Sequence, residues 1–286
     1  MDIRWTTPDL SPALPGTPMQ QHPSYARALA AFGRESVVAE VFEGSARIAR
    51  AQIALRQIGP VKLAWLARGP VWAGNKRPHC LTSLKRAAPW RALWITSIDE
   101  AMPRGLRVSR TLQMAEIDLR PDAVTRRAAL HGKWRNRLCR AEEAGLTLTA
   151  RPCRLPRDGA LLMREVAQRK ARGYSGLPPD FTAAWLAAHP SGSLLVEARQ
   201  GCQTLAFMLF LRHGDRATYH AGWTGALGRA LNAHNLTLWL ACEMLAKSGT
   251  TCVDLGRIDR AEPGLARFKR GAGALIITLP AAHLSV

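Results

Sequence analysis

The stretch that decides the fold is NAHNLTLWLACEMLAKSGTTCVDLG, residues 232–256. Residues 232–247 are almost all apolar and predict a helix buried on most sides, which Ser248 and Gly249 end. Residues 251–255 form a short apolar run typical of a buried strand. A buried helix that leads directly into a buried strand indicates a mixed α/β (α+β) fold with a sheet at its centre.

Working outward, strand-like runs recur in both halves of the chain and share their punctuation. Residues 36–40 (SVVAE) and Gly44 match residues 193–197 (SLLVE) and Gly201 at an offset of 157, and Ala49 and Ala64 fall on Ala206 and Ala221. An alanine-rich chain produces some such coincidences by chance; the alternative is an internal duplication of a helix–strand–strand–strand unit. On the second interpretation, residues 37–58 and 194–212 occupy equivalent strands. We expect an N-terminal domain over 1–121 and a C-terminal domain over 122–286, which opens with a helix over 122–144.

The composition is that of a globular, strongly basic protein. Of 286 residues 47% are hydrophobic, which excludes a disordered tail or a fibrous repeat. Lys and Arg number 40 against 21 Asp and Glu, a formal charge of +19. The excess serves solubility alone or matches a polyanionic partner: tRNA, a phosphorylated cofactor or substrate, or an anionic membrane surface in peripheral contact.

Cysteine spacing and hydropathy point to a reduced compartment. The six cysteines form no C-x-x-C pair and no metal-ligand spacing, so we expect no metal site. Residues 1–20 are polar and proline-rich, unlike a signal peptide, and no apolar run approaches the length of a transmembrane segment. The expectation is a soluble cytoplasmic protein without a transmembrane segment.

Two segments suggest phosphate binding. The helix predicted over 122–144 would carry four cations on one face: Arg126, Lys133, Arg137 and Arg140. Like charges on one face repel each other, and a phosphate-bearing partner would relieve that repulsion; the alternative is a face that is merely solvated. In residues 218–235 a strand leads into a helix through a loop that contains Gly225, Gly228 and Arg229. Backbone N–H groups in such a loop suit an anion, although an ordinary strand–helix turn has the same pattern.

Three further residues are candidates for chemistry. Asp254 ends the buried strand, where an acid marks an active-site edge, caps a helix or pairs with Arg257. His220 lies near a strand end and is either a general base or a buried structural histidine. Lys269, in FKRGAG (268–273), precedes two glycines that let the backbone approach a ligand, but a surface lysine in a hairpin has the same pattern.

Several segments, in order, resemble the FemAB-type branch of the GNAT acyltransferases. They are QHPSYARAL (21–29), Arg68-Gly69-Pro70, KWRNRLCRAEEAGL (133–146), the stretch 232–256, and GLARFKRGAGA (264–274). The resemblance spans nearly the whole chain, and only the ordered combination of these segments is specific. It implies two tandem GNAT-like domains with mixed, mostly antiparallel sheets flanked by helices.

The same resemblance implies a function: transfer of an acyl or aminoacyl group from acyl-CoA or aminoacyl-tRNA to an amine acceptor. The lysine of the family's F-K-x-G-x-G motif maps to Lys269, as a cation near the donor or the transition state. The pyrophosphate signature of GNAT enzymes is only approximated by residues 224–230, and Arg257 stands where relatives often carry a second glycine. Oxyanion stabilisation and positioning would supply most of the acceleration, without a covalent intermediate.

Two other functions are open at this stage. One is a non-catalytic, basic nucleic-acid-binding protein on a GNAT-like scaffold, which the charge favours; aromatic residues, at 6%, are too sparse for extensive base stacking. The other is a degenerate GNAT scaffold with a structural or regulatory role.

Overall fold

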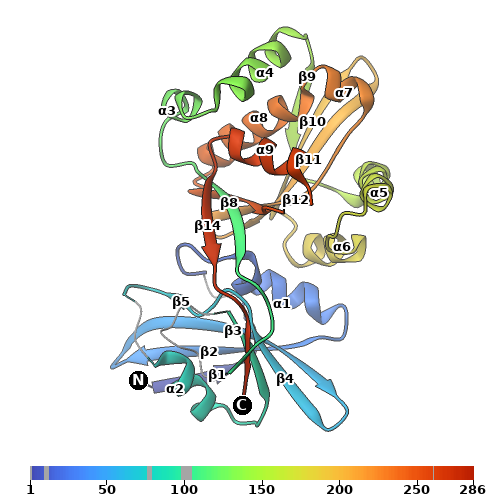
Figure 1. Ribbon diagram of the computed structural model, residues 1–286. Helices are drawn as coiled ribbons and strands as arrows, with labels where there is room; N and C mark the ends of the chain where they lie inside the picture. The colour runs from blue at the N-terminus through green and yellow to red at the C-terminus, as the bar shows by residue number, and fades with distance from the viewer. Residues whose placement is uncertain (1, 10–12, 76–78, 98–104, 260) are drawn as a thin grey trace. The chain divides into compact units, whose positions relative to one another are not determined.

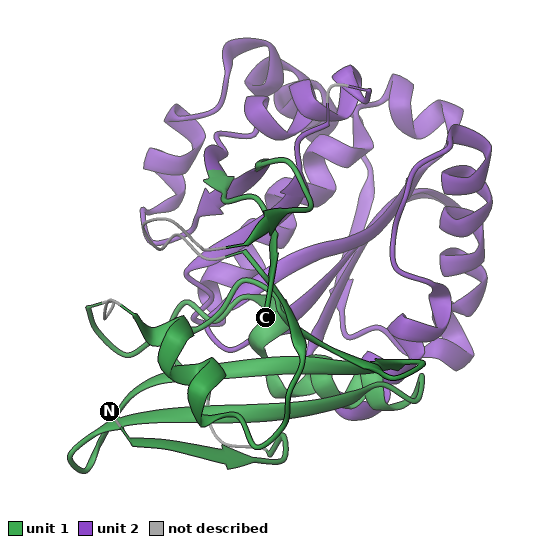
Figure 2. Ribbon diagram, turned by 60° about the horizontal axis from the view of Figure 1, so that its bottom comes forward, with its two compact units in different colours: residues 1–112, 278–286 green, residues 113–277 purple. Residues whose placement is uncertain are grey.

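A computed structural model describes residues 2–9, 13–75, 79–97, 105–259 and 261–286. The chain forms two compact units, residues 1–112 with 278–286 (unit 1) and residues 113–277 (unit 2), coloured green and purple in Figure 2. The bounds differ from the division expected at residue 121, because β8 (Leu112–Asp118) pairs with a strand of unit 2 and residues 278–286 return to unit 1. Both differences between the expected and the observed bounds result from strand pairing between segments that lie far apart in the sequence.

Unit 1 is a sheet with short helices (Figure 1). Its strands follow the order β1 (Asp2–Thr6), β2 (Glu35–Glu43), β3 (Ala46–Ile58), β4 (Val61–Leu66), β6 (Leu93–Thr96), β15 (His283–Ser285) and β7 (Leu106–Arg107), and β5 (Val71–Trp72) pairs with β3. The helices are η1 (Met19–Gln21), α1 (Pro23–Ala30) and α2 (Cys80–Ala87). Leu81 and Leu84 of α2 pack on Ala51, Ile53 and other side chains of the sheet.

Unit 2 is larger and has helices on both faces of its sheet. The strand order is β9 (Thr147–Arg151), β10 (Ser193–Gln200), β11 (Gln203–His213), β12 (Arg216–Thr224), β13 (Cys252–Arg257), β8 and β14 (Leu275–Leu279). The helices are α3 (Ala123–Ala128), α4 (Gly132–Glu143), α5 (Leu155–Arg172), α6 (Pro179–Ala188), α7 (Ala226–Ala230), α8 (Ala233–Lys247) and α9 (Pro263–Gly271). In both units the first four strands are antiparallel and the fifth runs parallel to the fourth, so the fold is that of two tandem, GNAT-like units with mixed sheets.

The first hairpin of each unit repeats at the offset seen in the sequence. Val38 pairs with Gln52 in unit 1, and Leu195 pairs with Leu209 in unit 2. Both members of the pair are shifted by 157 residues, so the register itself is repeated. The expected equivalence of residues 37–58 and 194–212 therefore holds at the level of strand pairing.

A β-bulge is repeated as well. The register shifts between Val41 and Phe42 in unit 1 and between Ala198 and Arg199 in unit 2, again at the same offset. A bulge places one extra residue in one strand and increases its twist. Its recurrence at equivalent positions supports duplication more strongly than matched residue types do.

The third strand departs from the repeat. Ala64 pairs with Leu55, whereas Ala221 pairs with Leu209, which is the equivalent of Gln52 and not of Leu55. The two alanines are therefore not equivalent, and their match in the sequence is a coincidence. Both turns contain two residues, but β11 ends at His213, two residues before the position equivalent to Ile58 at the end of β3, and β12 carries a bulge, so the register moves.

The core of unit 2 follows the alternation of its central strand. Met208 and Phe210 point to the face covered by α4 and α8, and Phe207 and Leu209 point to the face covered by α5 and α6. Successive side chains of a strand lie on opposite faces, so a strand covered on both faces is apolar throughout, as residues 205–211 are.

The helix predicted over 122–144 is two helices. Asp122 caps α3 by accepting a hydrogen bond from the Thr125 amide at 2.7 Å, as its position predicts. The chain then leaves the helix after Ala128 and starts α4 at Gly132, where the His131 amide donates to the Gly271 carbonyl at 3.0 Å. This long-range hydrogen bond interrupts a pattern that is locally helical throughout.

Candidate active site

A cavity of about 680 Å³, here called the unit 2 cavity, opens where β12 and β13 separate. The two strands pair at Arg216, Ala217 and Thr218 only, although β12 continues to Thr224. Beyond that point the strands diverge, and the cavity is lined by residues from β11, β12, β13, α4, α5, α6, α7, α8 and α9. Splayed parallel strands leave backbone and side-chain groups unpaired in the middle of the fold, which suits a ligand.

A bulge in β12 directs consecutive side chains toward this cavity. Leu209 pairs with Ala221 and Phe210 pairs with Tyr219, so His220 has no partner in the register. Tyr219, His220 and Ala221 all line the cavity. In a regular strand, neighbours would point to opposite faces.

His220 reaches the cavity but is held by a neighbour. Its Nε2 lies 2.7 Å from the hydroxyl oxygen of Thr182 on α6. Burial, with a smaller contribution from Arg169, lowers the pKa of His220 to about 4. The ring is neutral at pH 7 and is a weak base, which favours the structural role over general-base catalysis.

Asp254 does not line the cavity, in contrast to the expectation of an active-site acid. Its side chain is 2% exposed, and Oδ1 accepts a hydrogen bond from the Gly256 amide at 2.7 Å. Gly256 adopts a φ of +81°, a conformation that L-residues with side chains rarely adopt. Asp254 thus shapes the turn at the end of β13.

Lys269 lines the cavity from α9 and is buried, with 5% of its surface exposed. The segment is helical and not the surface hairpin that was the alternative, because Ala266 and Phe268 pack a helix against the sheet. The ammonium group donates to the Arg257 carbonyl at 2.7 Å. Burial lowers the pKa of Lys269, and the nearby Glu262 and Asp254 carboxylates partly oppose that shift.

Two acid–base groups of the cavity were not among the residues expected from the sequence. Glu165 of α5 forms an ion pair with Arg169 at 3.0 Å, and burial raises its pKa despite that partner. The hydroxyl group of Tyr219 makes no hydrogen bond to another described residue, and burial, followed by the charge of Glu165, raises its pKa. A local signal existed for Glu165, an acid among the many cations of the α5 sequence, but nothing local aims it at a cavity.

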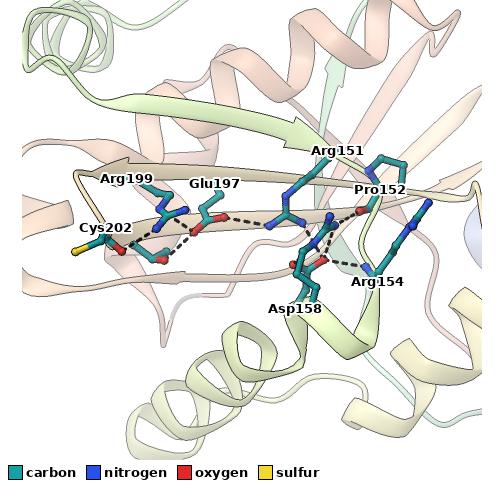
Figure 3. Close-up of polar contacts among 9 residues, drawn as sticks. Arg151, Pro152, Arg154, Asp158, Glu197, Arg199 and Cys202 are labelled. Carbon is teal, nitrogen blue, oxygen red and sulfur yellow. Dashed lines mark hydrogen bonds and ion pairs between the residues drawn. The ribbon is translucent and has the colours of Figure 1, made fainter.

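A buried ion network fixes the start of α5, the helix that carries Glu165 (Figure 3). Asp158 is 1% exposed and accepts hydrogen bonds from Arg151 Nη1 at 2.8 Å, the Arg154 amide at 2.8 Å and Arg157 Nε at 3.0 Å. Arg151 also pairs with Glu197 of β10 at 3.1 Å. Burial raises the pKa of Asp158, but these donors together outweigh it and hold the pKa below its usual value.

The expected basic face is divided by the break between α3 and α4. Arg126 is in α3 and is largely buried. Its guanidinium group pairs with Glu243 at 2.5 Å and donates to the carbonyls of Leu119 and Pro121, so it is already committed to partners within unit 2. Lys133, Arg137 and Arg140 are exposed on α4, and of these only Arg137 lines the cavity.

Of the three residues that the sequence predicts to bind phosphate in the loop after β12, two line the cavity. Gly228 and Arg229 line the cavity, and Gly225 precedes α7 outside the lining set. A Cβ on Gly228 would lie 2.3 Å from the Leu205 carbonyl oxygen, so this glycine is required for packing. Arg229 donates to the Thr224 carbonyl at 2.9 Å and forms no ion pair within the described part of the chain.

The described residues contain no group of three or more His, Cys, Asp or Glu side chains arranged to hold a metal ion. All six cysteines are free thiols. None of the helices in the described ranges is long and apolar enough to span a membrane.

Comparison with known protein families identifies a family for the part of the chain that forms the cavity. The family model of the acetyltransferase (GNAT) domain matches residues 126–270, which are about half of the chain. The chain belongs to the GNAT acetyltransferase-domain family. The match covers the cavity-forming part of unit 2 from α3 to α9, so the family assignment and the cavity coincide.

Solved structures give the fold of the whole chain. The crystal structure of FemX has a TM-score of 0.80 at 11% identity, covering 99% of this chain and 97% of that one. The C-terminal domain of a putative lysylphosphatidylglycerol synthetase from Agrobacterium fabrum has a TM-score of 0.54 at 15% identity, covering 93% and 88%. A tandem GNAT protein from the clavulanic acid biosynthesis pathway has a TM-score of 0.52 at 12% identity, covering 99% and 98%. No curated protein matches the sequence.

At the level of fold, these likenesses confirm the resemblance to FemAB-type, tandem GNAT proteins. The identities are too low to carry a substrate from any of these proteins to this chain.

Proposed function

We propose that this protein transfers an acyl or aminoacyl group from an activated, phosphate-bearing donor to an amine in the unit 2 cavity. The observation that carries the proposal is that one cavity holds a carboxyl with a raised pKa, Glu165, and a phenol with a raised pKa, Tyr219, together with arginines that lack acidic partners. A purely structural cavity does not need this combination.

Three arginines supply the phosphate-binding end. Arg137 of α4, Arg172 of α5 and Arg229 of α7 line the cavity, and none forms an ion pair with another described residue. The charges of Arg172 and Arg229 both act on His234 and lower its pKa, so these two guanidinium groups lie near one imidazole. Guanidinium groups bind phosphate oxygens in a bidentate manner, and here three of them line one cavity from separate elements.

The reacting end contains Glu165 and Tyr219. The amine nitrogen attacks the donor carbonyl carbon, and the carbonyl electrons move to oxygen. Glu165 accepts the proton that the amine loses, for which a raised pKa is suited. The bond to the leaving sulfur or oxygen then breaks, and Tyr219, which keeps its proton at neutral pH, donates it to that atom.

Lys269 serves this reaction through its position. Its ammonium group is fixed against the Arg257 carbonyl at the end of β13, beside the splayed strands. A cation held there stabilises negative charge that develops on the donor, and it needs no rearrangement during the reaction.

Both acyl-CoA and aminoacyl-tRNA carry a phosphate chain next to an activated carbonyl, so the arginines suit either. The weak pyrophosphate signature, in which Gly225 precedes the Gly228-Arg229-Ala230 segment, and the exposed basic residues of α4 favour the larger polyanion, aminoacyl-tRNA. We place the reaction in the cytoplasm, since all six thiols are free, as in a reducing compartment.

The test offers acetyl-CoA and a mixed pool of aminoacyl-tRNA separately to the purified protein, with a panel of primary amines. Donor consumption and the mass of the N-acylated product are followed. We expect one donor to be consumed, and Glu165→Gln to lower kcat by 10²-fold or more, as loss of a general base does. Glu143→Gln is the matched control, since Glu143 is exposed on α4 and outside the cavity.

If charged tRNA binds but is never consumed, the non-catalytic nucleic-acid-binding alternative replaces this proposal. If neither donor binds, or if Glu165→Gln keeps the wild-type rate, the assignment of the cavity is wrong.

A further inference from the structure

The side-chain N–H donor of Asn235 is a polar group that no other part of the described fold uses. Asn235 lies in the first turn of α8, lines the unit 2 cavity and is 5% exposed. Its Nδ2 atom has no hydrogen-bond partner within the described ranges. Buried polar atoms in folded proteins nearly always have a partner, so this donor is an exception that a ligand would explain.

The residues around Asn235 in α8 have found partners within the fold. His234 Nε2 lies 2.9 Å from the Trp223 carbonyl oxygen, and Thr237 Oγ1 donates to the His234 carbonyl at 3.2 Å. The adjacent Leu236 and Leu238 belong to the apolar cluster of the sheet. An apolar side chain of the same size would pack equally well at position 235, so packing does not explain the amide of Asn235.

The surroundings indicate which oxygen the amide binds. Asn235 lines the cavity together with Arg229 of α7 and Asn232, the residue that precedes α8. Met208, Leu255 and Phe268 line the cavity and belong to, or pack against, the apolar cluster on which α8 lies. A phosphate group would lose its hydration against such a wall, whereas a neutral carbonyl group fits it.

Lys269 leaves a role for a second donor. One of its N–H groups is committed to the Arg257 carbonyl, and burial weakens its hold on the proton. A neutral amide N–H is unaffected by pH and is already desolvated, so it interacts strongly with an oxygen that gains negative charge.

We propose that Asn235 is a catalytic residue whose Nδ2–H donates to the carbonyl oxygen of the acyl group being transferred. The amine nitrogen bonds to the carbonyl carbon, the π electrons move to that oxygen, and they return when the bond to the leaving sulfur or oxygen breaks. The amide proton stays on Nδ2 throughout, and the hydrogen bond is strongest in the tetrahedral state. This inference rests on the proposed acyl transfer.

The first test is kinetic and uses whichever of acetyl-CoA and aminoacyl-tRNA the wild type consumes. Asn235→Asp keeps the shape of the side chain and replaces the N–H donor with an oxygen. We expect kcat to fall by about 10²–10³-fold, the usual effect of losing one oxyanion donor, with KM for the donor changed by less than about threefold. Thr237→Val is the matched control, in the same helix but outside the cavity lining, and should keep kcat.

The second test uses the wild-type protein, so it does not depend on whether a variant folds. The Asn235 side-chain amide resonances of ¹⁵N-labelled wild-type protein are followed during titration with two inert analogues. These are acetonyl-CoA, a ketone in place of the thioester, and an adenosine that carries an aminoacyl group on a 3′-amide. We expect the analogue that binds to move one Asn235 amide proton downfield, because a new hydrogen bond deshields it.

The outcomes separate the two proposals. If one analogue binds while the Asn235 resonances stay in place, or if Asn235→Asp affects KM alone or nothing, the role of Asn235 is refuted and acyl transfer stands. If neither analogue binds and neither donor is consumed, the proposed function fails and this inference fails with it.

Discussion

Replacing Lys269 with methionine should both loosen the end of β13 and slow the reaction. The side chain is 5% exposed and its ammonium group donates to the Arg257 carbonyl over 2.7 Å. Methionine keeps most of the buried stem and removes only the charge and the donor. The change thus isolates the polar function of a residue that also packs.

The expected size follows from two opposing terms. A hydrogen bond from a charged donor contributes about 1.5–3 kcal/mol, and its loss leaves the Arg257 carbonyl without that partner. Removing a buried charge recovers part of this, as the lowered pKa of Lys269 shows. A net loss of about 1–2 kcal/mol should remain, and it corresponds to a fall in Tm of about 2–8 °C for a unit of this size.

The assays are thermal unfolding by circular dichroism and kcat with the donor that the wild type uses. We expect kcat to fall by about 10²–10³-fold, more than the loss of stability explains at 25 °C. Arg270→Met is the control, because Arg270 is exposed on the same helix. An unchanged Tm would refute the structural role, and an unchanged kcat with a lower Tm would refute the catalytic one.

Three further outcomes are expected. Arg137→Gln should weaken binding of the phosphate-bearing donor about tenfold and, for tRNA, flatten the slope of log K against log salt concentration by about one unit. Arg135→Gln is the control and should do neither, because Arg135 is exposed on the same helix but lies outside the cavity; equal effects of the two changes would remove Arg137 from the site. Asp158→Asn should cost about 2–3 kcal/mol in urea unfolding at pH 7, because it leaves Arg157 without a carboxylate and Arg151 with Glu197 alone, and a cost under about 0.5 kcal/mol would contradict that reasoning. The pKa values of His220 and His234 are lowered from 6.5 to about 4, so the unfolded chain takes up protons first as the pH falls. Unfolding free energy should therefore drop by about 2 kcal/mol per histidine between pH 7 and 5, which urea titrations at the two pH values measure; His220→Gln should reduce the drop, and an unchanged drop would be evidence against the shift.

The sequence alone was sufficient to predict the duplicated hairpin. Strand punctuation by glycine and the alternation of apolar residues are local properties, and pairing within a hairpin involves residues close in sequence. The offset between Ser36 and Ser193 therefore carries over to the register of both hairpins. The match between Ala64 and Ala221 did not carry over, because the position at which the next hairpin closes and a bulge in β12 decide that register.

The unit bounds and the helix break depended on distant partners. Residues 278–286 join unit 1 because β15 pairs with β6 and β7, and no local signal tells a terminal strand which sheet it will complete. The gap between α3 and α4 depends on a hydrogen bond to Gly271, far along the chain. That gap separates Arg126 from the α4 cations with which it seemed to share a face.

The sequence by itself marked Lys269 as a candidate site residue, since the motif around it is a property of residue order. Tertiary structure alone decided that Lys269 is helical and buried, and that Glu165, Tyr219 and Asn235 meet in one cavity. These three side chains come from α5, β12 and α8, and the separation of β12 from β13 brings them together. Local patterns report which face of an element is apolar, whereas the place where two paired strands part depends on everything packed around them.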